Sequence, residues 1–266
     1  MINYIILLPP SENKTDGGNN EYISIKDYNS NNSLNKKREY LYTSLLSYIN
    51  NASIDGLKDF FGITKDNLAL QAKELLQNHN KEKTLTAIER YTGVMFKYLD
   101  YHSLNQQSKQ NAEDSILLID GLFGLLTITD LIPNYKLPIG SKFKTSNQIF
   151  NMAKYWKDNL KNPLKETLSN KIVLDILPQS HREVVDNEII QSHNNYYKIN
   201  FYEIKNNTPK NSGHISKQLK GEFIRYILSF NEIDLKIIQS FQHSQGYKYS
   251  EEISNGNDLV FLGLVL

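Results

Sequence analysis

Short, continuous apolar runs interrupt the chain at intervals and predict the strands of a buried sheet. Residues 4–8, 115–119 and 172–177 are such runs, and each is stopped by proline or by an Asp-Gly pair. Residues 196–204 alternate apolar and polar positions, as a strand does. Residues 258–266 are apolar on both faces, so we expect that strand at a central position in a covered sheet.

Between these runs, apolar residues recur at helical spacing. Helices are predicted over residues 34–49, 93–104, 149–160 and 213–229, and two short ones over 53–61 and 64–76, joined at Gly62. Residues 87–91 fit a strand or a helix, and 122–131 lack clean periodicity, so we expect irregular structure there. The order predicts a mixed α/β (α+β) body over residues 1–266, with a largely buried central sheet, surrounding helices and no linker.

The composition allows a folded core and narrows the chemistry. Of the 266 residues, 39% are hydrophobic and 11% aromatic, which is enough apolar material to close a core. The chain has no Cys, which excludes disulfides, thiolate nucleophiles and Cys-ligated metals and suits a reducing compartment. The first residues lack the basic region of a signal peptide, and residues 259–266 are too few to span a bilayer. We therefore expect a cytoplasmic protein with no membrane partner and no disulfide-linked partner.

Net charge and motifs remove several further classes. The formal charge of +1 gives no global basic field, so any surface for a polyanion must be local. The sequence has neither the P-loop nor the dinucleotide-binding glycine pattern, and no His-Glu-x-x-His. The six His are scattered. We assign no metal and no cofactor.

The loop that follows the first predicted strand carries the best candidates for chemistry. Ser11, Glu12 and Lys14 come directly after Pro9-Pro10, at a strand exit where α/β sheets gather ligands. A Lys of lowered pKa beside a Ser or a carboxylate can act as a base or nucleophile, and the same Lys can instead hold a phosphate. Both roles stay open for Lys14.

This loop is also the first of several blocks that resemble one family. Residues 8–18, Leu-Pro-Pro-Ser-Glu-Asn-Lys-Thr-Asp-Gly-Gly, resemble the N-terminal signature of the YaaA family in its Pro-Pro-Ser-Glu-x-Lys branch. Further similar blocks follow in family order at residues 87–93, 121–137, 155–156, 210–217 and 246–261. Lys136 and Lys217 stand where the family usually has Arg, which keeps the charge but loses bidentate phosphate geometry.

The resemblance implies a peroxide stress protein that limits oxidative damage and binds DNA through a basic cleft and a helix-hairpin-helix-like element, here at about 53–78. The residues it suggests for phosphate contacts are Lys14, Gly62, Lys65, Lys136, Lys210, Gly213 and Lys217. Tyr91, Tyr135 and Trp156 are the candidate cleft aromatics, which can stack on bases or belong to the core. We expect DNA as the partner of a monomer.

The local charge and the turn at Gly62 support DNA binding only in part. Residues 203–225 carry five Lys or Arg against two Glu, the most basic stretch that also carries a motif, although a charged helix face is usually just solvated. Gly62 suits either a phosphate-binding hairpin or an ordinary helix turn. One alternative is an enzyme acting on a nucleic-acid base or nucleotide-like molecule, with Glu12 or Lys14 as acid/base. Another is a protein-interaction scaffold with a large exposed apolar patch.

Overall fold

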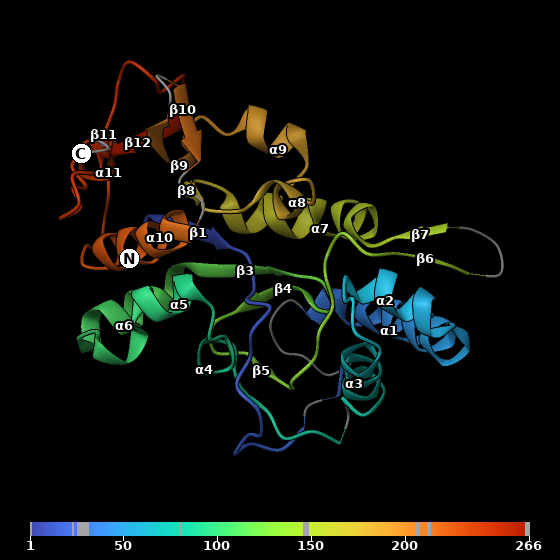
Figure 1. Cartoon of the computed structure of the whole chain (residues 1–266). Helices are drawn as coiled ribbons and strands as arrows, with labels where there is room; N and C mark the ends of the chain where they lie inside the picture. The colour runs from blue at the N-terminus through green and yellow to red at the C-terminus, as the bar shows by residue number, and fades with distance from the viewer. Residues whose placement is uncertain are drawn as a thin grey trace.

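The computed structural model describes residues 2–22, 24–25, 32–79, 81–145, 149–205, 208–211 and 214–263. Its centre is an eight-stranded sheet in the order β11-β12-β9-β8-β1-β3-β4, with β10 paired to β9 (Figure 1). The strands are β1 (Tyr4–Leu8), β3 (Ile116–Asp120), β4 (Gly124–Thr127), β8 (Ile172–Asp175), β9 (Tyr196–Lys205), β10 (Thr208–Asn211), β11 (Lys248–Tyr249) and β12 (Asp258–Gly263). The predicted mixed α/β fold class is confirmed.

The middle of this sheet is parallel and covered on both faces. β1 pairs in parallel with β3 and β8, β9 lies parallel to β8 and β12, and β4, β10 and β11 are antiparallel additions. Every residue of β1 and β3 is buried, which explains why both read as continuous apolar runs. β12 lies between β9 and the two-residue edge strand β11, and residues 264–266 of the predicted strand lie outside the described part.

Helices lie on both sides of the sheet. α5 (Val94–Leu99), α6 (Gln106–Ser115) and α10 (His214–Ile227) gather on one side and α7 (Met152–Leu168) on the other (Figure 1). α10 packs so closely on α5 that only glycine fits at position 221, since an added Cβ would come within 2.4 Å of the Met95 carbonyl oxygen. On the other side, the buried Trp156 indole of α7 donates a 2.8 Å hydrogen bond to the Gly121 carbonyl.

Three further helices and a hairpin extend the body beside β4. They are α1 (Asn35–Asn51), α2 (Ile54–Phe61), α3 (Asp66–Gln77) and the hairpin of β6 (Lys142–Lys144) with β7 (Ile149–Asn151). The fully buried Arg38 ties α1 to the sheet, since its guanidinium donates to the carbonyls of Phe123 (2.8 Å) and Leu125 (2.9 Å). These bonds satisfy a charge that would otherwise be costly to bury.

The remaining elements are short. They are η1 (Asn32–Leu34), α4 (Ala87–Arg90), η2 (Tyr101–Ser103), α8 (Gln179–Arg182), α9 (Asn187–Ser192), α11 (Leu235–Gln239) and the pair of β2 (Leu85–Thr86) with β5 (Leu131–Ile132). Residues 87–91, for which the sequence allowed a strand or a helix, are helical except for the last. No helix in the described ranges has both the length and the apolar character required to cross a bilayer.

Three expectations about elements were wrong. The helix predicted over residues 93–104 ends at Leu99, because Asp100 is left-handed (φ 46°), and the separate turn η2 follows. Residues 122–131 contain β4, whose first three residues are buried, so burial of both faces had removed the alternation that marks a half-exposed strand. Residues 149–151 are strand β7, not helix, and α7 then continues to Leu168 through Pro163. The buried Leu160, Leu164 and Leu168 carry the helical stripe past the proline, and their packing offsets the roughly 3 kcal/mol that an interior proline costs.

Candidate functional site

The carboxyl ends of β1 and β8 lie at the kind of sheet edge where α/β proteins commonly bind ligands. The chain leaves β1 towards β3 on one side, and it leaves β8 through α8 and α9 towards β9 on the other. Where neighbouring parallel strands connect in opposite directions, a crevice opens at their carboxyl ends, and α/β proteins bind ligands there. The loop with Ser11, Glu12 and Lys14 begins at this point.

Backbone pairing fixes the course of that loop. Lys14 forms an isolated antiparallel bridge with Tyr91. On either side of it, the Thr15 N–H donates to the Arg90 carbonyl at 2.8 Å, and the Thr92 N–H donates to the Asn13 carbonyl at 3.1 Å. Arg90 is fully buried and donates to the carbonyl of Lys83 at 3.0 Å, to that of Ile132 and to that of Thr15. Hydrogen bonds therefore hold residues 13–15 of the loop against α4, and Arg90 links them to β5.

A recess of about 260 Å³ lies at this edge. Its walls come from the loop after β1, the end of β3, the segment between β5 and β6, and α8. The lining residues are Pro10, Ser11, Glu12, Lys14, Asp120, Tyr135, Lys136, Leu137, Pro138, Ile139, Gly140, Ser180 and His181.

Lys14 is one of two groups lining the recess whose pKa is lowered by burial. Its Nζ donates to the Ser11 carbonyl at 3.0 Å and lies 4.6 Å from the ring centre of Tyr135 and 5.4 Å from that of Tyr91. Burial lowers the pKa of Lys14 to about 8, although the negative charges of Asp120 and Glu12 act in the opposite direction. A pKa near 8 leaves about one amine in ten unprotonated at pH 7, a far larger share than for an exposed Lys.

Asp120 organises the floor of the recess. One carboxylate oxygen accepts from the backbone N–H groups of Leu122 (2.7 Å) and Phe123 (2.9 Å). The other accepts from the phenol groups of Tyr135 (2.6 Å) and Tyr91 (3.2 Å). Asp120 is 1% exposed, and these four donors compensate the burial of its charge. The same bonds fix the two rings over which the Lys14 amine lies.

The rim of the recess carries an ion pair. Lys136 lies 3.3 Å from the Glu12 carboxylate, whose side chain is 84% exposed. The two lysines that line the recess are thus matched by two carboxylates, those of Glu12 and Asp120. Such a balanced site favours a small polar molecule over a long polyanion, which requires an excess of cations.

The short helix α8 supplies the opposite wall. Ser180 Oγ lies 3.2 Å from His181 Nδ1, and both residues line the recess. Burial lowers the pKa of His181 to about 4, against the opposite effect of Asp120 and Glu12. His181 is therefore neutral at physiological pH, with one ring nitrogen able to donate and one able to accept.

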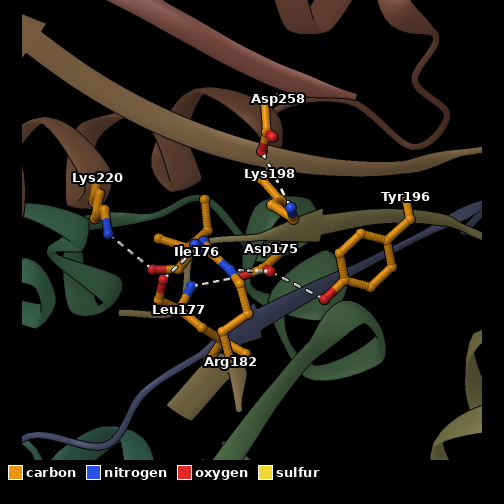
Figure 2. A network of polar contacts seen from close by, with 8 residues as sticks. All are labelled: Asp175, Ile176, Leu177, Arg182, Tyr196, Lys198, Lys220 and Asp258. Carbon is orange, nitrogen blue, oxygen red and sulfur yellow. Dashed lines mark hydrogen bonds and ion pairs between the residues drawn. The ribbon is translucent and has the colours of Figure 1, made fainter. Parts of the chain in front are cut away.

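A buried polar network behind this wall holds α8 in place (Figure 2). The Arg182 guanidinium contacts both carboxylate oxygens of Asp175, at 2.6 and 3.2 Å, and also donates to the Leu177 carbonyl at 2.9 Å. Asp175 is fully buried and accepts two more bonds, from the Tyr196 phenol at 3.0 Å and the Leu177 N–H at 2.8 Å. The carboxylate at the end of β8 thus fixes the helical turn that carries His181.

Figure 2 also shows a half-buried amine, that of Lys220, at this edge of the sheet. Lys220 of α10 donates to the Ile176 carbonyl at 2.9 Å, while Lys198 and Asp258 pair at 3.4 Å. Burial lowers the pKa of Lys220 to about 8, and the nearby charges of Arg182 and Lys217 act in the same direction. Lys220 does not belong to the lining of the recess.

The structure separates the sequence-predicted site residues into groups. Ser11, Glu12, Lys14, Tyr135 and Lys136 meet in the recess, and Tyr91 joins them through Asp120 and the Lys14 amine. Trp156 does not line it, because its side chain is 0% exposed in the core behind the turn before β4.

The predicted phosphate-binding residues outside the recess lie on other elements. Gly62 and Lys65 are exposed between α2 and α3, with Gly62 in the left-handed conformation (φ 63°). Lys210 is exposed on β10 and Lys217 on α10, whereas Gly213 lies outside the described residues. No group of three or more potential metal-ligating side chains occurs in the part of the chain that the structure describes.

Sequence reasoning missed Asp120, His181 and Asp175 as site residues. Each Asp interrupts or ends an otherwise apolar strand, and a carboxylate at a buried strand position must be compensated by several donors. That signal was present in the sequence. The sequence carries no such signal for His181. Its position depends on the ion pair of Arg182 with Asp175, which forms only in the folded chain.

The chain is similar to known proteins over most of its length. Residues 4–253 match the family described as peroxide stress protein YaaA. A UPF0246 protein from Malacoplasma penetrans is 25% identical over 96% of this chain and 98% of its own length. UPF0246 proteins from Rickettsia bellii and Francisella philomiragia are 29% and 26% identical, each over 82% of this chain and over 86% and 87% of their own lengths. The chain belongs to the peroxide stress protein YaaA family.

Proposed function

We propose that this protein acts in peroxide stress as an enzyme on a nucleic-acid base or a nucleotide-like small molecule, with Lys14 as the group that transfers a proton. The family description supports the stress-related role. The observation that carries the chemistry is the amine of Lys14, whose pKa is lowered to about 8 by burial at the edge of the recess. Perturbed amines in clefts are typical of acid/base sites.

The dimensions of the recess define the class of substrate. Its volume of about 260 Å³ is below the roughly 300–1,000 Å³ of sites for drug-sized ligands. A single base or a molecule of similar size fits this volume. Neutral His181 and Ser180 on one wall and Lys136 on the rim provide donors and acceptors for the polar edge of a heterocycle.

Of the two acid/base candidates, Lys14 suits the role better than Glu12. Glu12 is 84% exposed and paired with Lys136, so its carboxylate has the environment of an ordinary surface acid. The Lys14 amine instead lies over two aromatic rings that are held by a buried carboxylate. Its unprotonated form accepts a proton from a bound molecule, and Asp120 then stabilises the resulting cation.

Amine labelling tests whether Lys14 has the proposed reactivity. Acetylation by a limiting amount of acetic anhydride, read by mass spectrometry of peptides, is expected to give Lys14 a rate that levels off near pH 8, and the rate of the exposed Lys165 is recorded as the reference. A Lys14 rate that follows that of Lys165 over the whole range contradicts the proposal.

Function is tested in a peroxide-sensitive strain that lacks the endogenous protein. We expect wild type and Lys165→Met to restore growth in peroxide, and Lys14→Met and Lys14→Arg to fail although both accumulate as folded protein. Growth restored by Lys14→Met sinks the catalytic role. In parallel, wild-type protein is incubated with a panel of bases and nucleosides, oxidised forms included, and products are identified by liquid chromatography and mass spectrometry.

DNA binding is the second candidate, and the observation that favours it is the hairpin between α2 and α3. Gly62 is left-handed there, and the N–H of Ile63 donates to the Lys58 carbonyl at 2.9 Å, so the turn is compact and exposed. Its phosphate affinity is opposed by acids, since Lys58 is already paired with Asp55 at 2.7 Å and with Asp66 at 3.1 Å.

Gel-shift titrations at two salt concentrations test this candidate. With duplex, bubble and single-stranded DNA, binding is expected to weaken as salt rises and to weaken further in a Lys65→Gln, Lys210→Gln, Lys217→Gln variant. Undetectable or salt-insensitive micromolar binding rules the candidate out.

A further inference from the structure

The hydrogen bonds of the Lys14 amine suit a nucleophile better than a fixed charge. Its Nζ donates to one acceptor, the Ser11 carbonyl at 3.0 Å, and it has no ion-pair partner in the described part of the chain. An ammonium group has three N–H donors and no lone pair, whereas a neutral amine has two donors and a lone pair. A single acceptor therefore leaves the charged form less satisfied than the neutral form.

The other lysine of the recess is arranged differently. The Lys136 amine lies 3.3 Å from the Glu12 carboxylate, which holds it as one half of an ion pair. Lys165 of α7 is exposed to water. These two lysines are internal references for the reactivity of Lys14, one within the same recess and one on the surface.

Two aromatic faces lie against the Lys14 amine. Its Nζ is 4.6 Å from the ring centre of Tyr135 and 5.4 Å from that of Tyr91, and both phenols donate to the buried Asp120 carboxylate. The face of an aromatic ring attracts a cation, whether it is an ammonium or the iminium that an amine forms with an aldehyde. An iminium nitrogen has one N–H, which matches the one acceptor that the Ser11 carbonyl offers.

The remaining walls of the recess suit the ring and the oxygen of a small carbonyl compound. Leu137, Pro138 and Ile139 supply an apolar wall, and Ser180 and His181 supply a polar one. Burial keeps His181 neutral at pH 7, so its ring can donate one hydrogen bond, as the Ser180 hydroxyl can. Hydrogen bonds to a carbonyl oxygen stabilise the negative charge that develops there when an amine attacks the carbon. The volume of about 260 Å³ accommodates a single heterocycle.

We propose that Lys14 forms an imine with a base-sized aldehyde, a heterocycle that carries a formyl group. The inference rests on the proposed function and narrows its substrate class from any nucleic-acid base to one with an aldehyde. Lysines in apolar surroundings are the usual partners of carbonyl substrates in covalent catalysis. Oxidation of the methyl group of a pyrimidine base gives such an aldehyde, which agrees with the stress-related role of the family.

The covalent step needs neither an oxidant nor a reductant. The lone pair of the neutral Lys14 amine attacks the carbonyl carbon, and the electrons of the C=O double bond move to the oxygen, which gains a proton. The C–O bond then breaks while the nitrogen lone pair forms the C=N bond. The two protons that the amine loses leave with the oxygen as water, and a proton from solvent gives the charged iminium over the two rings.

Reductive trapping tests the proposal. Wild-type protein is incubated at pH 7 with 5-formyluracil and sodium cyanoborohydride, which reduces an imine to a stable amine, and its peptides are identified by mass spectrometry. Lys14 is expected to gain the mass of the aldehyde less one oxygen, about ten times faster than Lys136 or Lys165, because burial favours its neutral amine. Thymine, which has a methyl group in place of the formyl group, is expected to slow this labelling by occupying the recess.

A variant tests the role of the aromatic faces. Tyr135→Leu is expected to slow the labelling of Lys14 about fivefold, within the range that loss of a cation–π contact gives, and to leave the labelling of Lys165 unchanged. Melting curves show whether the variant is folded. Labelling of Lys14 at the wild-type rate in folded Tyr135→Leu would contradict stabilisation of the iminium by the rings.

The outcomes separate this inference from the function on which it rests. If the acetylation rate of Lys14 levels off near pH 8 but its 5-formyluracil adduct forms no faster than that of Lys136, the imine is wrong while proton transfer by Lys14 stands. If Lys14 follows Lys165 with both reagents, both proposals fail. Pyridoxal 5′-phosphate is a larger, charged aldehyde, and an equal preference of this reagent for Lys14 would overturn the base-sized substrate class.

Discussion

At the scale of single residues, the protein keeps a charge where burial disfavours it. Burial lowers the pKa of Lys14 to about 8, and its contacts with two rings and one carbonyl do not restore the ordinary value. Such a residue costs stability whenever it is protonated, and proteins commonly retain this cost where the group has a function. Arg38 and Arg90 are also buried, but their donors are used by backbone carbonyls, which makes them structural.

Replacing Lys14 by Met is therefore expected to stabilise the protein at pH 7. The folded-state pKa of about 8 lies below the unfolded value of 10.5, so between these values the unfolded chain binds more protons and wild-type stability rises with pH. The advantage of Lys14→Met should be largest below pH 8 and shrink towards pH 10. Urea unfolding at pH 7 and pH 10 measures it, with Lys165→Met as the exposed control. Equal stabilisation at both pH values would contradict the pKa argument.

Gly124 is a residue whose backbone and surroundings both require glycine. Its φ is +75°, and an added Cβ would lie 2.5 Å from the Trp156 ring. Gly124→Ala is expected to destabilise the protein by about 2 kcal/mol or more, since left-handed strain and a clash in the core add. Gly140→Ala is the matched control, because its Cβ would meet nothing within 4 Å. Thermal melts are expected to give Gly124→Ala a lower melting temperature than Gly140→Ala. Similar melting temperatures would contradict the prediction.

At the scale of elements, the recess depends on short segments that are anchored by buried charges. α8 has four residues and cannot be stable alone, so Arg182 and Asp175 hold it against the end of β8. β3 ends in the same way, with Asp120 closing the turn into β4 through the N–H groups of Leu122 and Phe123. Two buried aspartates, one on each strand next to β1, thus shape the segments on both sides of the recess.

Breaking the anchor of α8 should be costly. Arg182→Met leaves the fully buried Asp175 without its ionic partner, and we expect a loss of about 3 kcal/mol in the free energy of unfolding. Adding Asp175→Asn to Arg182→Met should recover part of that loss, because it removes the uncompensated charge. Lys198→Met, which breaks only the pair with the half-exposed Asp258, should cost about 1 kcal/mol or less. Denaturant titrations that give Arg182→Met and Lys198→Met the same cost would contradict this account.

At the scale of the whole molecule, one contiguous core joins the main strands and helices. The cluster of buried apolar residues runs from β1 through α1–α3 and α7 to α10 and β12, so no boundary in the core divides the described chain.

Unfolding is accordingly expected to be a single cooperative transition. The sole Trp of the chain, Trp156, is fully buried between α7 and the sheet and reports on the core, whereas far-UV circular dichroism reports on all helices. In guanidinium the two signals should have the same midpoint and slope. Separate midpoints would show that residues 1–266 contain two units, against the single domain predicted from the sequence.

The sequence by itself determined the family, the fold class and the main elements of the core, which are the strands β1, β3, β8, β9 and β12 and the helices α1–α3, α5, α7 and α10. Continuous apolar runs such as residues 4–8 can only be buried, and helical spacing such as that of α1 and α10 needs no distant partner to be recognised. The loop with Ser11, Glu12 and Lys14 followed from its place after a buried strand and from its family-like motif.

Only the tertiary structure decided how these residues act together. The burial that perturbs Lys14, the rings of Tyr91 and Tyr135 under its amine, and the arrival of His181 from α8 all join segments far apart in the chain. The same holds for Trp156, which its motif suggested for the cleft and which packing placed in the core. The physical reason is that burial and electrostatic contact depend on distances through space, and spacing along the chain does not contain them.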